Sequence, residues 1–206
     1  MIEPEPTETA LSSTLSNHRH THRMKPIKPL ITSVLLVMTA LAAATSSVRE
    51  ISVKDIEGKA TSLAAYKGKV VLVVNVASKC GLTPQYSALE ATHKKFKSKG
   101  FTVVGFPCND FAGQEPGTAE DIKTFCKTKY DVSFPLMEKL HVKGPEQHPL
   151  YAALTGPGAK FPGDVEWNFG KFLVGKDGTV LKRFAPKTTP DAPEVIAAIE
   201  EALKAK

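Results

Sequence analysis

The chain has 206 residues, of which 42% are hydrophobic and 7% aromatic, enough for one domain with a substantial core. Its formal charge of +6 comes from scattered lysines without interleaved aromatic residues, a pattern typical of a solvated surface, so we expect no nucleic-acid partner. The three cysteines, Cys80, Cys108 and Cys126, are too few for a disulfide framework and form no CxxC or zinc-ligand pair, so their spacing favours thiol chemistry over a metal site.

The first 44 residues are predicted to lie outside the folded domain. Residues 24–44 combine two lysines, an apolar stretch and small residues suited to cleavage, which is the layout of a secretory signal peptide. The apolar stretch is short for a membrane span, which needs about 20 residues. Residues 1–23 form a polar extension, and we interpret Met24 as the true start of translation. We therefore expect an exported, periplasmic or secreted protein; an uncleaved membrane anchor is the alternative.

The first half of residues 45–206 predicts strands joined by a helix. Alternation around Glu57-Gly58 indicates a short hairpin, and the β-branched run 70–76 is typical of a central strand buried on both faces. Thr83 is a candidate N-cap, with Pro84 at the first position of a helix that ends at Lys99-Gly100. The stretch 101–107 returns as a second strand, so the three elements predict a parallel βαβ unit.

The second half predicts three more helices, one of them over 148–154, and a hairpin. Thr118 is a candidate cap for a helix over 119–130, on which Cys126 shares the apolar side. Asp177-Gly178 marks a hairpin turn, and a last amphipathic helix is expected to open at Pro190 or Asp191. Together these elements predict an α/β domain with a central sheet and helices on both faces.

Cys80 is the first candidate for chemistry. It follows a buried parallel strand and precedes a helix N-terminus, the crevice in which open α/β sheets place ligands. Unpaired backbone N–H groups and the positive end of the helix dipole should stabilise the thiolate there, and Lys79 adds a cation. In the string CGLT, Thr83 stands where thioredoxin-like proteins have a second cysteine, so any resolving thiol must come from elsewhere.

Four long motifs in order carry a resemblance to a known family: NVASKCGLTPQYSALE, GFPCNDFAGQEPG, FCKTKYDVSFPLM and WNFGKFLVGKDGTV. On these the domain resembles the glutathione peroxidase family, specifically its cysteine-containing, thioredoxin-dependent members. The resemblance implies a thioredoxin-like fold with a central mixed β-sheet, and a peroxidatic Cys80 assisted by Gln114, Trp167 and Asn168. Amide and indole N–H groups are neutral donors that can bond the thiolate and the departing oxygen without adding a competing charge.

The remaining cysteines are harder to assign. Cys126 fits core packing, yet its segment resembles the resolving-cysteine segment of the two-cysteine members, and we favour the resolving role, which requires its helix to open. Cys108 reads as buried and structural. Asp110 stands where the family commonly has glutamine, and we expect its carboxylate to face solvent.

The resemblance implies a peroxidase that reduces hydrogen peroxide and organic or lipid hydroperoxides through a Cys80 sulfenic acid. A thioredoxin-like protein or glutathione would recycle the thiols, and the short segment before Trp167 implies a monomer. We expect no cofactor and no metal; the alternating His18, His20 and His22 are read as part of a polar tail, with a metal-binding tag as the alternative. A peroxide-sensing redox relay is the alternative function.

Overall fold

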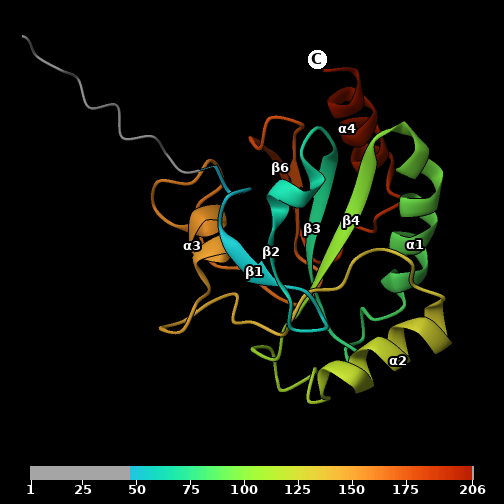
Figure 1. Ribbon diagram of the computed structural model, residues 1–206, viewed down its shortest axis with the longest axis vertical. Helices are drawn as coiled ribbons and strands as arrows, with labels where there is room; N and C mark the ends of the chain where they lie inside the picture. Colours follow the sequence, from blue (N-terminus) through green and yellow to red (C-terminus); the bar gives the residue numbers. More distant parts are fainter. Residues whose placement is uncertain (1–46, 206) are drawn as a thin grey trace, which may run out of the picture. The chain divides into compact units, whose positions relative to one another are not determined.

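The computed structural model describes residues 47–205, so the polar extension, the predicted signal peptide and its histidines lie outside the described residues. The sequence before β3 forms a hairpin of β1 (Ser52–Lys54) and β2 (Ala60–Ser62), followed by the 3₁₀ helix η1 (Leu63–Tyr66). The elements that follow, shown in Figure 1, are β3 (Val70–Val76), α1 (Gln85–Phe96), η2 (Lys97–Lys99), β4 (Phe101–Pro107), α2 (Ala119–Tyr130), α3 (Pro149–Thr155), β5 (Lys171–Val174), β6 (Val180–Phe184) and α4 (Pro193–Lys204).

The central sheet is mixed, with the strand order β4-β3-β5-β6. β3 and β4 pair in parallel through the helix α1, which confirms the predicted βαβ unit. β5 pairs antiparallel with both β3 and β6. Because β5 runs against β3, its first residues lie at the same sheet edge as the last residues of β3, where Cys80 follows.

Helices cover both faces of this sheet, as predicted. α1, α2 and α4 pack over one face of β3, around Leu72 and Val74, and α3 and the β1-β2 hairpin pack over the other face, around Val71 and Val73. Figure 1 shows α3 on one side of the sheet and α1 and α4 on the other. All seven residues of β3 are buried, because apolar side chains point into a core on each side.

Two helix starts differ from the prediction. α1 begins at Gln85 with Pro84 as the N-cap residue, because the hydroxyl of Thr83 is bonded within the preceding loop instead of to the helix. α4 begins at Pro193, after a turn, and not at Pro190 or Asp191. Prolines at the first helical position explain the α4 start, since proline lacks the N–H that is unpaired there in any case.

The cap of α2 is confirmed. The Thr118 hydroxyl accepts from the Asp121 backbone N–H at 3.2 Å, and the Asp121 carboxylate accepts from the Thr118 backbone N–H at 2.9 Å. This reciprocal pair is a capping box. Only Ile122 and Cys126 of this helix are buried, so α2 is a shallowly docked element.

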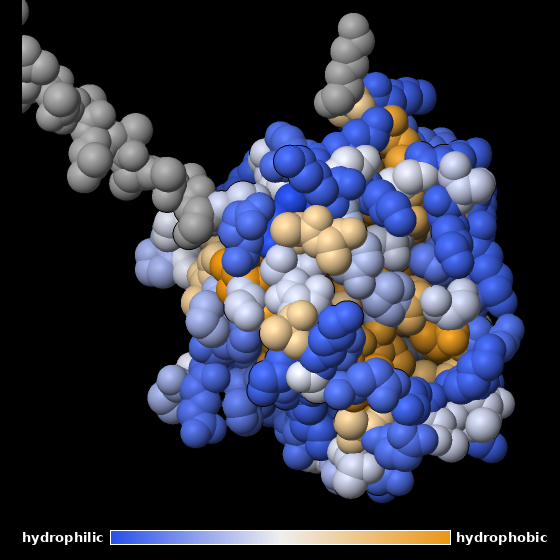
Figure 2. Space-filling model, viewed as in Figure 1, coloured by the Kyte–Doolittle hydropathy of each residue, from blue (hydrophilic) through white to orange (hydrophobic). Residues whose placement is uncertain are grey.

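The surface agrees with the charge pattern. Figure 2 shows a mostly hydrophilic face, with apolar side chains gathered in a hollow in the region between α1 and α2. Within residues 47–205 no helix is long and apolar enough to cross a membrane. The same residues hold no group of three or more histidine, cysteine or acidic side chains that could bind a metal ion.

Candidate active site

Cys80 lies in the loop between β3 and α1, at the sheet edge predicted for it. Its side chain is 7% exposed, and its sulfur accepts a hydrogen bond from the backbone N–H of Leu82 at 3.3 Å. Thr83 holds the loop in shape, since its hydroxyl accepts from the Cys80 backbone N–H at 2.9 Å and donates to the Ala77 carbonyl at 2.8 Å. Thr83, which stands where a CxxC motif has its second cysteine, therefore stabilises the conformation of the loop that carries Cys80.

Gln114 and Asn168 come together beside this loop from distant parts of the chain. The Asn168 side-chain amide donates to Gln114 Oε1 at 2.9 Å, and the Gln114 backbone carbonyl accepts from the Lys79 backbone N–H at 3.0 Å. The first hydrogen bond joins Asn168 to Gln114, and the second joins Gln114 to Lys79, the residue before Cys80. Among the described residues the Gln114 side-chain N–H groups have no bonded partner, so they remain available as donors.

Trp167 lies on the open side of the same loop. It is 39% exposed, its ring packs against Phe111 with centroids 5.3 Å apart, and it shares a cavity of about 430 Å³ with Leu82 and Pro186. Since Leu82 also donates to the Cys80 sulfur, this cavity reaches the thiol loop. No described hydrogen bond runs from Trp167, Gln114 or Asn168 to the sulfur itself; the Leu82 amide supplies the one that is formed.

The turn that carries Trp167 and Asn168 is held under backbone strain. Phe169 has φ +66°, the left-handed region that non-glycine residues rarely adopt. Asn75 in β3 binds this turn twice, accepting from the Phe169 N–H at 2.6 Å and donating its amide to the Trp167 carbonyl at 3.1 Å. Such strain persists only where several contacts fix it, and it is a feature of functional sites.

Lys171 adds another contact to this turn. It is fully buried, and its Nζ donates to the carbonyl oxygens of Phe169 at 2.6 Å and Pro186 at 3.3 Å. Burial lowers the pKa of Lys171 from 10.5 to about 7, because the charged form loses its hydration.

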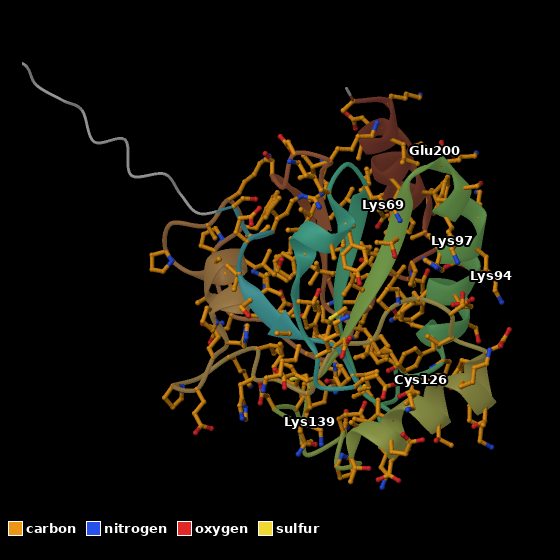
Figure 3. The ribbon with its side chains drawn as sticks, viewed as in Figure 1. Lys69, Lys94, Lys97, Cys126, Lys139 and Glu200 are labelled. Carbon is orange, nitrogen blue, oxygen red and sulfur yellow. The ribbon has the colours of Figure 1, made fainter. Side chains whose placement is uncertain are left out.

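Cys126 is buried on α2, and Figure 3 labels it on the side of that helix that faces the rest of the domain. Burial raises the pKa of the Cys126 thiol to about 11; the Tyr86 hydroxyl, which faces the sulfur, opposes this rise and Glu115 adds to it. A cavity of about 320 Å³ lies between the Cys80 loop, at Ser78 and Lys79, and the α2 residues Ile122 and Phe125. All three cysteines are free thiols.

Cys108 is fully buried, as predicted, and burial raises its pKa to about 12. The prediction for Asp110 is wrong. Its side chain is only 8% exposed, and its carboxylate accepts from the Val142 backbone N–H at 2.7 Å and pairs with His141 Nδ1 at 2.6 Å. The carboxylate therefore fastens the segment after β4 to the segment before α3.

Comparison with known proteins decides the family. The family model for glutathione peroxidase matches residues 48–155. The chain belongs to the glutathione peroxidase family. It is 53% identical over 152 residues to the hydroperoxy fatty acid reductase Gpx2 of Synechocystis sp., covering 74% of this chain and 96% of that protein. It is 46% identical over 172 residues to the thioredoxin/glutathione peroxidase BtuE of Escherichia coli, covering 73% of this chain and 94% of that protein.

Solved structures agree on the fold. The crystal structure of Trgpx in its apo form matches with a TM-score of 0.62 at 40% identity, over 78% of this chain and 97% of that one. A thiol:disulfide interchange protein DsbE from Chlorobium tepidum matches with a TM-score of 0.52 at 21% identity, over 74% of this chain and 92% of that one, which shows the thioredoxin-like fold alone. This member of the glutathione peroxidase family is thus an α/β protein of thioredoxin-like fold and a peroxidase, as the motifs predict.

Sequence reasoning missed three residues of the site. The hydrogen bond from the Leu82 backbone N–H could not be predicted, because every residue except proline carries a backbone N–H and the sequence does not show which one lies beside the sulfur. Asn75 and Lys171 were absorbed into strand patterns, although a polar residue inside the otherwise β-branched run 70–76 was a usable signal.

Proposed function

We propose that this protein reduces hydrogen peroxide and organic or lipid hydroperoxides with Cys80 as the peroxidatic thiol and Gln114, Trp167 and Asn168 as its assistants. The observation that carries the proposal is the convergence on the Cys80 loop of three segments far apart in sequence. They are joined through the 2.9 Å bond of Asn168 to Gln114, the 3.0 Å bond of Lys79 to Gln114 and the cavity shared by Leu82 and Trp167.

In the first step the Cys80 thiolate attacks the terminal oxygen of the hydroperoxide and the O–O bond breaks. The sulfur is oxidised to a sulfenic acid, the peroxide is reduced, and the departing alkoxide or hydroxide takes one proton to leave as alcohol or water. N–H donors aimed at the developing negative charge lower the barrier; a single such donor is worth about 3 to 4 kcal/mol in another enzyme. Gln114 Nε2 and the Trp167 indole N–H are the free donors suited to this task.

In the second step Cys126 attacks the Cys80 sulfenic acid, forming the disulfide and releasing water. With its pKa near 11, the buried Cys126 thiol is protonated at neutral pH, and it is a poor nucleophile while α2 is folded against the domain. Opening of α2 would expose the thiol, lower its pKa toward the ordinary value of about 8.5 and let it reach Cys80. The shallow docking of α2 and the cavity of about 320 Å³ beside it support this opening.

We assign the reductant to a thioredoxin-like protein, with glutathione as the alternative. The E. coli relative is named a thioredoxin/glutathione peroxidase. The Synechocystis relative is named a hydroperoxy fatty acid reductase, and the cavity of about 430 Å³ beside Trp167 offers apolar surface from Leu82 and Pro186 for such a substrate. A domain of this kind is expected to act as a monomer.

We also propose that residues 24–44 direct export and are removed, which places the domain in the periplasm or outside the cell. The alternative is retention as a membrane anchor. Mass spectrometry of the N-terminal peptide from cells decides between them, since a first residue near position 45 requires cleavage and a peptide that begins at residue 25 or earlier excludes it.

The deciding experiment is peroxide consumption by the wild type, Cys80→Ser, Cys126→Ser and the matched control Cys108→Ser, each with thioredoxin and then glutathione as reductant. We expect Cys80→Ser to lose activity with both and Cys108→Ser to keep it. Loss of thioredoxin-supported turnover alone in Cys126→Ser marks the resolving thiol. A wild type that oxidises with one equivalent of peroxide but does not turn over with any dithiol favours the redox relay.

A further inference from the structure

Lys171 is a buried cation that the reaction described above does not use. Its side chain is fully buried, and burial is the sole resolved cause of its lowered pKa of about 7. An ammonium group buried without a carboxylate is costly, so it is retained only where its hydrogen bonds serve the structure or the chemistry.

Its two acceptors are both backbone carbonyls beside the proposed active site. Phe169, at 2.6 Å, follows Trp167 and Asn168 and holds the strained φ of +66°. Pro186, at 3.3 Å, lines the cavity next to Trp167, and its carbonyl also accepts from Gln85 Nε2 at 2.8 Å, at the start of α1. Lys171 therefore links the strained turn, the segment after β6 and the helix that follows Cys80.

We propose that Lys171 is a positioning residue for peroxide reduction, whose ammonium group ties the Phe169 carbonyl to the Pro186 carbonyl and so fixes Trp167 and Asn168 beside the Cys80 loop. The kinetic part of this inference rests on the proposed function; the structural part does not. Charge-assisted hydrogen bonds are roughly twice as strong as neutral ones, so the turn is held more firmly when Lys171 is protonated than when it is neutral.

The charged groups on neighbouring elements either bond other residues or are exposed to solvent. On α1, Glu90 bonds Ser133 and Lys94, and the His93 ring accepts from the Val103 N–H. On β6, Arg183 donates to the carbonyls of residues 161–164 and Lys182 is exposed. On α4, Glu194 is exposed, and beside Trp167 the exposed groups are Glu166 and Lys187. None of these groups is a resolved cause of the Lys171 pKa.

Trp167 reports on the proposal directly, because it is the single tryptophan of the chain. We would compare wild type, Lys171→Met, Lys171→Gln and the exposed control Lys182→Met by tryptophan emission and acrylamide quenching from pH 5.5 to 9. In wild type and Lys182→Met the emission should show a transition near pH 7, and in both Lys171 variants that transition should be absent and quenching stronger. A wild type without the transition, or Lys171 variants that retain it, overturns the proposal.

Rapid kinetics then test positioning. We expect Lys171→Met to lower kcat/KM for hydrogen peroxide by at least about tenfold, since small misplacements of catalytic groups are costly, while alkylation of Cys80 by iodoacetamide stays within about twofold. Equal loss of both rates would mean general damage to the thiol loop and would contradict positioning. If Lys171→Met does not fold, Lys171→Gln and the wild-type titration still test the positioning role. A wild type without peroxidase activity would refute the proposed function, and the fluorescence test of Lys171 would remain valid.

Discussion

Removing the N-cap of α2 should speed the second half of the catalytic cycle. If Cys126 reaches Cys80 only after α2 opens, any change that makes the helix easier to open raises the rate of disulfide formation. Thr118 is suited to this test because it caps α2 through Asp121, with contacts of 3.2, 2.9 and 2.8 Å, and lies outside the proposed catalytic set.

The size of the effect follows from the cap. Replacing a threonine N-cap with alanine costs about 1 kcal/mol of helix stability, and Thr118→Ala loses both hydroxyl contacts to Asp121. A loss of about 1 kcal/mol shifts the opening equilibrium by roughly fivefold. α2 fully buries only Ile122 and Cys126, with Phe125 and Tyr130 half-buried against Tyr86, and the cap loss adds to whatever holds the helix closed, so we expect disulfide formation to accelerate by about that factor.

The assay mixes reduced protein with one equivalent of peroxide and follows Trp167 fluorescence. Samples quenched with dimedone measure the Cys80 sulfenic acid, and non-reducing mass spectrometry measures the disulfide. Ser62→Ala is the matched control, since Ser62 caps η1 through the Ala64 N–H at 3.2 Å, remote from Cys126 in sequence and fold.

The outcome separates two mechanisms. Sulfenic acid should form at the same rate in wild type, Thr118→Ala and Ser62→Ala, and only Thr118→Ala should convert it to disulfide faster. An unchanged or slower conversion in Thr118→Ala refutes the reasoning that α2 opening precedes the resolving step.

Three further predictions concern titration. At pH 8 iodoacetamide should alkylate Cys80 well before Cys126 and Cys108, whose pKa values burial raises to about 11 and 12, as peptide mass spectrometry will show. The pKa of Lys171 is about 7 in the folded protein and 10.5 in the unfolded chain, so the unfolded chain binds more protons above pH 7. The free energy of unfolding of wild type relative to Lys171→Met, measured by urea denaturation, should therefore rise by roughly 3 kcal/mol from pH 6 to 9. A difference that does not change with pH would contradict the burial of Lys171. Burial alone would raise the pKa of Glu90, but hydrogen bonds from Ser133 and Lys94 outweigh burial and lower it. This carboxylate therefore stabilises the fold above its unfolded pKa of 4.5 and loses that effect in acid. Glu90→Gln should lower the free energy of unfolding by about 1 to 3 kcal/mol at pH 7 and by little at pH 3.

Local patterns predicted the elements because each of them has a local cause. β3 is an apolar run that only burial on both faces explains, and α2 has its cap and buried stripe within 12 residues. The hairpin turn at Asp177-Gly178 is fixed by a glycine at φ +92° and by the Asp177 side chain, which accepts from the Thr179 N–H at 2.9 Å. Such features can be predicted because the interacting groups are neighbours in sequence.

The remaining features depend on partners that local patterns do not reveal. Thr83 has the sequence of an N-cap, yet its hydroxyl bonds Ala77 and Cys80 across the loop, so the helix starts at Gln85, one residue later than predicted. Asp110 looked like a surface residue until its partners, 31 and 32 positions away, were known. Lys171 sits in a strand that appears ordinary, and its role depends on the carbonyls of a turn and of the next loop.

The two halves of the site differ in how they are held, and this difference follows the proposed division of labour. The turn of Trp167 and Asn168 is fixed by two hydrogen bonds with Asn75 and one from Lys171, which also bonds the Pro186 carbonyl, because donors that stabilise a developing charge must already be in place. Cys126 lies instead on a helix with two buried residues, next to a cavity. A thiol needed only for packing gains nothing from such a shallow element, whereas a thiol that must leave the core to meet a sulfenic acid requires one. We therefore infer that the weak docking of α2 is itself part of the catalytic cycle, and that variants which anchor α2 more firmly will accumulate the Cys80 sulfenic acid.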